Sequence, residues 1–234
     1  YPDKLMSAML PSGNCWIFMV SWISVSLPSA VWHTPRVVFV IKPEIRDLIH
    51  RLDCTPRTIL DVGCGPGNST FALKQRFPDA EILGIDNSEN MIENAKSAHP
   101  DLLFRFQEVD SRFQTGSKYD LIFSNACIHW IPNHAELIPN MLNALNPGGT
   151  LAIQIPEPWN MPMYQILEHL QQQPEWTKIR GVRNFHARQP EEYYDLLTAH
   201  AAEFSMWETA YIQTMNGIEG IVEWYRGSGL RPYL

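Results

Sequence analysis

A glycine-rich turn over residues 63–67 constrains this chain more than any other feature of its sequence. The turn follows a short apolar run, residues 58–60, that predicts a buried strand. It precedes residues 68–77, whose pattern predicts a helix that Pro78 ends. Glycines at such a junction let the backbone turn tightly and approach a ligand closely. The sequence therefore predicts a strand–turn–helix unit with a ligand at the turn.

The same alternation of strand and helix continues along the chain. Further strands are predicted at residues 81–85, 103–109, 120–124, 150–155 and 206–215. Further helices are predicted at residues 43–52, 89–97 (with Ser88 as N-cap), 134–145, 161–170, 193–202 and 218–225. Strands that alternate with helices form parallel βαβ units. The expected fold class is therefore α/β, with a Rossmann-like, doubly wound and mostly parallel sheet.

Composition and charge fit one globular domain and limit its partners. The chain has 234 residues, of which 45% are hydrophobic and 18% charged. Its formal net charge of −7 predicts no general affinity for nucleic acid or anionic membranes. The apolar run at residues 15–27 is shorter than the roughly 18 residues of a membrane helix. The four cysteines form no CxxC pair, so we expect reduced thiols, a cytoplasmic location and no metal site.

The residues around the turn distinguish between two classes of cofactor. A dinucleotide places its negative pyrophosphate at the helix N-terminus, where the carboxylate of Asp61 would repel it. Its G-x-G-x-x-G fingerprint also needs a third glycine where this chain has Asn68. S-adenosylmethionine brings an ammonium and a sulfonium instead, which Asp61 can attract directly or through water. The turn therefore favours S-adenosylmethionine and disfavours a nicotinamide dehydrogenase.

Polar residues follow the expected carboxyl ends of four successive strands, the edge at which open α/β sheets bind ligands. Asp86 is expected to accept hydrogen bonds from ribose hydroxyls, and Asp110 from the adenine amino group. Solvated strand ends also often carry Asp or Asn, so the prediction depends on the four ends together. The predicted cofactor-binding residues are Asp61, Gly63, Gly65, Gly67, Asp86, Asn87, Asp110, Ser111 and Asn125.

From residue 42 onwards the chain resembles the class I S-adenosylmethionine-dependent methyltransferases, and within them the trans-aconitate methyltransferases. The stretches TILDVGCGPGNST and ILGIDNSENMI are shared widely in that superfamily, whereas LNPGGTLAIQIP, EEYYDLL and IVEWYRGSGLRPYL carry the narrower likeness. The resemblance implies methyl transfer from S-adenosylmethionine to a carboxylate of a small polycarboxylic acid such as trans-aconitate, giving a monomethyl ester. Residues 1–41 do not match the family, so we expect the domain to span residues 42–234.

The resemblance also implies a seventh strand after residue 234, inserted antiparallel between the strands predicted at 150–155 and 206–215. We therefore expect the domain to be incomplete at its carboxyl end and to lack its last strand. The two neighbouring strands would then have no ladder partner, and exposed edges of this kind favour aggregation. On this basis the chain alone is expected to be poorly soluble or only weakly active.

A carboxylate substrate needs no general base, because its pKa near ~4 leaves it ionised at neutral pH. Alignment of the reacting atoms then accounts for catalysis, and no catalytic residue is assigned. The predicted substrate-binding residues are His129 and Trp130, which follow the fourth strand, and Arg226 and Arg231, whose guanidinium groups can bind carboxylates. His129 and His134 have no third ligand nearby, so no metal is expected. Two alternatives stay open: methylation of another small metabolite, and a module that binds the cofactor without transfer.

Overall fold

The computed structural model describes residues 36–40, 45–156, 162–182, 185–209 and 217–226. The chain divides into two compact units. The sheet unit comprises residues 22–156 and 186–209, and the helical unit comprises residues 1–21, 157–185 and 210–234.

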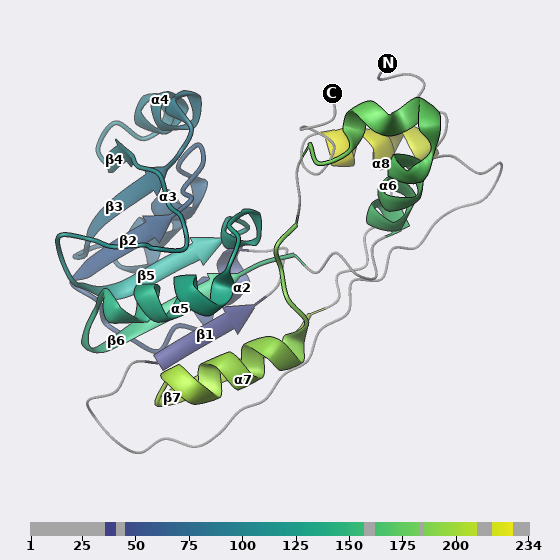
Figure 1. Ribbon diagram of the computed structural model, residues 1–234. Coiled ribbons are helices and arrows are strands. Elements are labelled where there is room, and N and C mark those ends of the chain that lie inside the picture. Colours follow the sequence, from purple (N-terminus) through teal and green to yellow (C-terminus); the bar gives the residue numbers. More distant parts are fainter. Residues whose placement is uncertain (1–35, 41–44, 157–161, 183–184, 210–216, 227–234) are drawn as a thin grey trace. The chain divides into compact units, whose positions relative to one another are not determined.

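The sheet unit is built on a seven-stranded sheet in the order β4-β3-β2-β5-β6-β1-β7, and every strand pair is parallel. Figure 1 shows these strands side by side. The predicted α/β class and its parallel, Rossmann-like sheet are confirmed. The strands are β1 (Arg36–Val40), β2 (Thr58–Val62), β3 (Glu81–Asp86), β4 (Leu103–Phe106), β5 (Tyr119–Asn125), β6 (Leu145–Gln154) and β7 (Glu203–Met206).

The helices of the sheet unit follow from the order of its strands. From β2 the chain moves outward through β3 to β4, and then returns to β5 and β6 on the other side of β2. Because parallel crossovers are right-handed, these two directions place helices on opposite faces. One face carries α2 and α3, whose buried side chains form a core with Ile59, Leu121 and Phe123. The helices are α2 (Ile45–His50), α3 (Asn68–Arg76), α4 (Glu89–Ala98), α5 (His134–Asn143), α7 (Pro190–His200) and the 3-10 turn η1 (Ile128–Trp130).

Strand pairing sets two element boundaries that differ from the prediction. β4 ends at Phe106 instead of residue 109, because its partner β3 ends at Asp86, which is in register with Phe106. β7 covers residues 203–206 and therefore begins before the predicted strand at 206–215, because it is in register with residues 36–39 of β1. Residues 210–215 of that predicted strand lie outside the described residues. The predicted cap of α4 is confirmed: Ser88 Oγ accepts a hydrogen bond of 3.4 Å from the Met91 amide.

The expectation of a vacant position in the sheet is wrong. β1 lies between β6 and β7, with Arg36 in register with Thr150 on one side and with Glu203 on the other. This strand is parallel to both neighbours and comes from residues 36–40, whereas the expected strand was antiparallel and lay beyond residue 234. The unpaired strand edges that led us to expect poor solubility are therefore absent at this place in the sheet. The domain boundary at residue 42 stays a prediction, although β1 precedes it.

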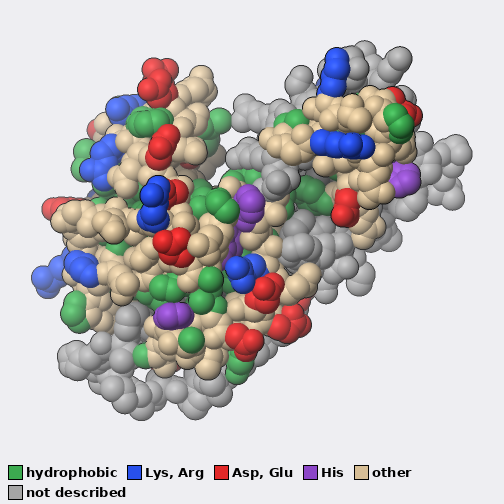
Figure 2. Space-filling view, in the orientation of Figure 1, with side chains coloured by type: hydrophobic (Ala, Val, Ile, Leu, Met, Phe, Trp, Pro, Cys, Tyr) green, Lys and Arg blue, Asp and Glu red, His purple; other side chains and the backbone are tan. Residues whose placement is uncertain are grey.

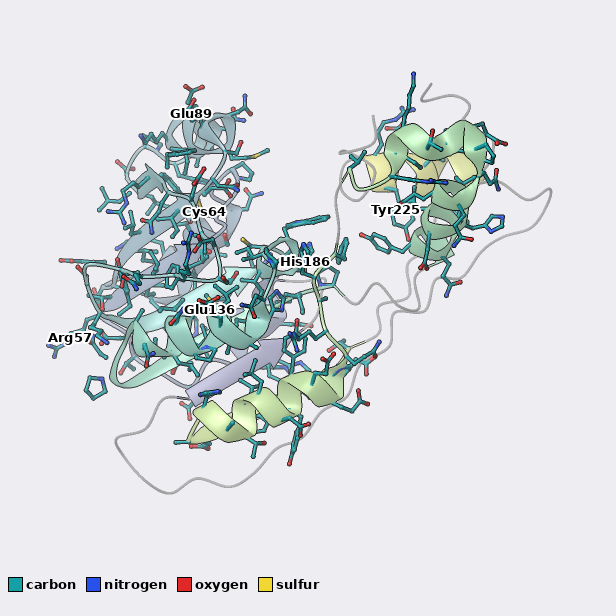
Figure 3. All side chains as sticks on the ribbon, viewed as in Figure 1. Arg57, Cys64, Glu89, Glu136, His186 and Tyr225 are labelled. Carbon is teal, nitrogen blue, oxygen red and sulfur yellow. The ribbon has the colours of Figure 1, made fainter. Side chains whose placement is uncertain are left out.

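The helical unit has its own core. It contains α6 (Pro162–Gln172), the 3-10 helix η2 (Pro174–Ile179) and α8 (Gly217–Arg226). Leu167 and Leu170 of α6 pack with Trp176 and Ile179 of η2 and with Tyr225 of α8, which is labelled in Figure 3. Across the described parts of both units, no helix has the length and apolar character needed to cross a membrane.

Candidate functional site

The glycine turn is hydrogen-bonded to the carboxyl end of β3. The amides of Gly63 and Cys64 both donate to the carbonyl of Ile85, at 2.8 and 3.0 Å, and the Gly67 amide donates to the Cys64 carbonyl at 3.0 Å. Gly63, Gly65 and Gly67 all have positive φ angles, of 76°, 54° and 92°. The predicted strand–turn–helix unit is confirmed, and Cys64 marks it in Figure 3. Burial raises the pKa of the Cys64 thiol, which fits a packing role for this side chain.

The three glycines meet different surroundings. A Cβ at Gly63 would lie 2.2 Å from Cys127 Sγ, and a Cβ at Gly67 would lie 2.9 Å from atoms of His99 and Phe104. These two positions therefore need glycine for close packing. A Cβ at Gly65 would meet no described atom within 4 Å. Gly65 is thus the part of the turn whose backbone a ligand can approach.

Asp61 lies beneath the turn and is 0% exposed. Its Oδ2 accepts hydrogen bonds of 2.6 Å from the hydroxyls of both Ser69 and Thr70, which lie in the first turn of α3. Its Oδ1 is buried and has no hydrogen-bond partner among the described residues. Burial raises the pKa of Asp61 to about 6, against the opposing effect of the two hydroxyls. Asp61 was predicted from the sequence as a site residue, whereas its two hydroxyl partners, Ser69 and Thr70, were not.

Asp86 ends β3 and lies directly beside the turn. Its Oδ2 accepts a hydrogen bond of 2.9 Å from the Gly65 amide, and its Oδ1 accepts one of 2.9 Å from the Ser88 amide. The carboxylate is half-buried, and the neighbouring Asn87 is exposed. The structure therefore brings the predicted ribose acceptor to Gly65, which among the three glycines of the turn is the one that faces open space.

Two carboxamide side chains end adjacent strands at the same edge of the sheet. Asn125 of β5 is in register with Gln154 of β6, and residues in register on parallel strands point to the same face. Gln154 is 1% exposed, and within the described residues neither Asn125 Oδ1 nor Gln154 Oε1 has a hydrogen-bond partner. Asp61 is in register with Phe123, two residues before Asn125, so it shares that face.

Gln154 was not predicted as a site residue, because the predicted strand at residues 150–155 continued past it to Ile155. In the structure β6 ends at Gln154, as β5 ends at Asn125. A buried oxygen without a partner is costly in a folded protein, so Asp61, Asn125 and Gln154 together point to an occupant at this edge.

The prediction that a strand ends at Asp110 is wrong. Because β4 ends at Phe106, Asp110 and Ser111 lie in the following connection. Asp110 is exposed and forms an ion pair of 2.8 Å with Arg112, which lowers the pKa of Asp110. Ser111 Oγ donates a hydrogen bond of 2.6 Å to Glu136 of α5. A contact from Asp110 to adenine would therefore compete with the Arg112 pair.

His129 and Trp130 lie in η1, directly after β5. Their ring centroids are 4.4 Å apart, His129 is 2% exposed and Trp130 is half-buried. The His129 carbonyl accepts a hydrogen bond of 2.9 Å from the amide of His186, which is labelled in Figure 3. Of the two predicted contacts, Trp130 is the more accessible to a substrate.

The predicted cations belong to the other unit or lie outside the described residues. Arg226 ends α8, is 44% exposed, and pairs with Glu223 at 2.5 Å. Arg231 lies outside the described residues. On the visible face of the sheet unit, Lys and Arg are interspersed with Asp and Glu (Figure 2). Among the residues that the structure describes, no three or more His, Cys, Asp or Glu side chains are grouped to hold a metal ion.

Comparisons with known proteins give one consistent family. A family described as "Methyltransferase domain" matches residues 56–208. The trans-aconitate 2-methyltransferase of Azoarcus sp. (strain BH72) is 41% identical over 193 residues, which cover 81% of this chain and 75% of that protein. The trans-aconitate 2-methyltransferase of Methylobacterium radiotolerans is 39% identical and covers 76% of this chain and 70% of that protein. The same-named protein of Yersinia pestis is 35% identical and covers 82% and 76%.

A solved structure supports the fold. Phosphoethanolamine N-methyltransferase 2 of Haemonchus contortus, solved in complex with S-adenosyl-L-methionine, superposes with a TM-score of 0.52. It is 17% identical and covers 67% of this chain and 36% of that chain, so the likeness concerns the fold alone.

Proposed function

We propose, since this chain belongs to the family of S-adenosylmethionine-dependent methyltransferases, that it methylates a carboxylate of trans-aconitate to give a monomethyl ester. The observation that carries the choice of substrate is the identity of 35–41% to trans-aconitate 2-methyltransferases over most of both chains. The site described above supports the choice of cofactor.

The residues at the glycine turn fit S-adenosylmethionine. Asp61 Oδ1 is a buried acceptor without a described partner, and a cationic donor satisfies such an oxygen better than a neutral one. A pyrophosphate at the same place would meet the carboxylates of Asp61 and Asp86 and be repelled. When bound, S-adenosylmethionine supplies a methyl group on a sulfonium, which makes that methyl electrophilic.

The turn and the residues beside it each have a separate proposed role in binding the cofactor. The open backbone at Gly65 lets the cofactor approach, and Asp86 is proposed to accept hydrogen bonds from its ribose hydroxyls. Asp61 is proposed to attract its cationic methionyl end, directly or through water. Asn125 ends β5, the strand that pairs with β2, and is proposed to lie beside the reacting groups.

The substrate side needs positioning more than acid–base chemistry. A carboxylate of trans-aconitate is ionised at neutral pH, so the protein has no proton to remove from the nucleophile. Trp130, His129 and Gln154 are proposed to orient the substrate at the carboxyl end of β5 and β6. Arg226 and Arg231 are proposed to bind its other carboxylates; only Nη1 of Arg226 contacts Glu223, and the guanidinium has further N–H donors.

The test is direct detection of product. Purified protein is incubated with S-adenosylmethionine and trans-aconitate, and mass spectrometry measures the monomethyl ester and S-adenosylhomocysteine. Citrate, isocitrate and cis-aconitate serve as competing substrates, and NAD serves as a control ligand in calorimetry. Cofactor binding without ester from any acid favours the alternative of a binding module, and ester from a different acid favours another small metabolite. Steady-state kinetics test the two proposed cations. Arg226→Ala and Arg231→Ala should each raise the KM of trans-aconitate and leave the affinity for S-adenosylmethionine nearly unchanged. A cytoplasmic location stays a prediction.

A further inference from the structure

A chain of buried polar groups joins α7 to the turn that carries the proposed substrate contacts. His134 opens α5, Tyr193 lies in α7, and both side chains are fully buried. His134 Nδ1 lies 2.5 Å from the Tyr193 hydroxyl, and His134 Nε2 lies 2.8 Å from the Ile128 carbonyl. The Tyr193 hydroxyl also accepts a hydrogen bond of 3.1 Å from the Arg188 amide.

The partners fix the direction of every hydrogen bond in this buried polar network. Burial lowers the pKa of His134, so the ring is neutral and carries one N–H. The Ile128 carbonyl can only accept, so the proton is on Nε2. Nδ1 is then an acceptor and takes the proton of the Tyr193 hydroxyl, whose oxygen is left to accept from the Arg188 amide. Each donor therefore meets one acceptor.

The turn η1, at the end of this buried polar network, depends on contacts from other elements. Ile128 is the first residue of η1, and Ala126 before it and Asn133 after it have positive φ angles of 51° and 58°. Asn adopts this region readily, whereas for Ala126 it is unfavourable and needs support from surrounding contacts. A second tie reaches the same turn from the segment before α7, because the His186 amide donates to the His129 carbonyl at 2.9 Å.

We infer that Tyr193 and His134 are positioning residues, which hold η1 so that Trp130 and His129 stay at the carboxyl end of β5. The inference rests on the proposed function, because it takes η1 to be a substrate contact. A buried Phe–Leu pair would fill the same space without two polar groups to satisfy. The polar pair adds a directed link to the Ile128 carbonyl, which an apolar pair cannot make. Its role is therefore to fix η1.

The central variant is Tyr193→Phe, which removes one hydroxyl from the chain. The next residue supplies a matched control, since Tyr194 lies on the same helix, is 43% exposed and loses only a solvated hydroxyl in Tyr194→Phe. Hydrogen exchange of residues 126–133 is measured by mass spectrometry, together with the KM of trans-aconitate and the Kd of S-adenosylmethionine. Unfolding temperature is recorded for both variants.

Tyr193→Phe should speed exchange in residues 126–133 and raise the KM by about 2- to 10-fold, the effect of one lost neutral hydrogen bond. The Kd of S-adenosylmethionine and exchange in β2 and β3 should not change, and Tyr194→Phe should change nothing. In a His134→Phe background, Tyr193→Phe should have no further effect on the KM. Unchanged exchange and KM in Tyr193→Phe would overturn the inference, and so would equal loosening of the whole sheet, which is a purely structural effect.

The exchange measurement separates this inference from the proposed function. If the wild type makes no ester from trans-aconitate, the proposed function fails, and exchange in residues 126–133 still decides whether Tyr193 holds the turn. If the wild type makes the ester while Tyr193→Phe leaves exchange and KM as they were, only the positioning role fails.

Discussion

Gly65 and Asp86, which are 21 residues apart in sequence, are joined by a hydrogen bond of 2.9 Å from the Gly65 amide to Asp86 Oδ2. The other oxygen of the same carboxylate accepts the Ser88 amide at the start of α4. Asp86 thus fixes the ligand-facing part of the glycine turn while remaining half-exposed at the sheet edge. Since a carboxylate has about four lone-pair positions, it can hold both amides and still accept from a ligand.

Asp86→Asn should weaken binding of both S-adenosylmethionine and S-adenosylhomocysteine, because both carry the ribose that Asp86 is proposed to bind. Loss of hydrogen bonds to a charged acceptor corresponds to about 1.5–3 kcal/mol, or roughly 10- to 150-fold in Kd. Isothermal calorimetry measures both ligands, with the exposed Asp101→Asn as the control. If only the methylated ligand binds more weakly, Asp86 acts on the sulfonium charge and its ribose assignment is wrong.

Asp61 should make both stability and cofactor binding depend on pH, with opposite signs. Its pKa is about 6 in the folded chain and 3.8 as the ordinary value, so the folded state binds a proton more tightly than the unfolded state. Stability should therefore fall as pH rises from about 4 to about 6, and stay level above that. Affinity for S-adenosylmethionine should rise over the same window, because the ionised carboxylate attracts the cation.

The variant Asp61→Asn separates these two effects. It should raise the free energy of unfolding at pH 8 by roughly 1–3 kcal/mol, since no buried charge remains, and it should weaken S-adenosylmethionine binding at the same pH. Urea unfolding and calorimetry at pH 5 and pH 8 provide the measurements. Wild-type affinity of Asp61→Asn at pH 8 would show that the methionyl end does not depend on this carboxylate.

The glycine turn allows a paired test of packing against ligand access. Gly63→Ala places a Cβ 2.2 Å from Cys127 Sγ at a φ of 76°, so it should cost roughly 2–5 kcal/mol of stability. Gly65→Ala meets no described atom and should cost only about 1–2 kcal/mol, from its positive φ. Its Kd for S-adenosylmethionine should nevertheless rise more than tenfold (about 1.4 kcal/mol), because the methyl group occupies the open face. Normal binding by Gly65→Ala would mean that the cofactor approaches elsewhere.

Local sequence patterns were sufficient for the parallel sheet and for the residues that end its central strands. Asp86 and Asn125 lie at the carboxyl edge as predicted, because apolar runs of strand length locate β3 and β5 without knowledge of their partners. Ser88 was likewise predictable as an N-cap from the residue type and its place before a helical pattern.

Features that depend on a distant partner were not predictable. β1 belongs to the sheet only through its pairing with β6 and β7, more than a hundred residues away, and nothing in residues 36–40 specifies that register. The end of β4 is set by the end of β3, which is why Asp110 was expected directly at a strand end and instead lies beyond it in the following connection. The buried oxygens of Asp61 and Gln154 follow from tertiary burial, which a single sequence does not contain.

Gln154 gives the last prediction, because its buried Oε1 has no hydrogen-bond partner among the described residues. Gln154→Leu removes that oxygen and keeps most of the side-chain volume, so the unliganded protein should be as stable as the wild type or up to about 2 kcal/mol more stable. If Gln154 orients the substrate, the same variant should raise the KM of trans-aconitate by about tenfold or more, with kcat and S-adenosylmethionine affinity less affected. Thr150→Val is the matched control, since Thr150 is buried on the same face of β6 and farther from the carboxyl edge. A destabilised Gln154→Leu protein with an unchanged KM would assign Gln154 to the fold and remove it from the site.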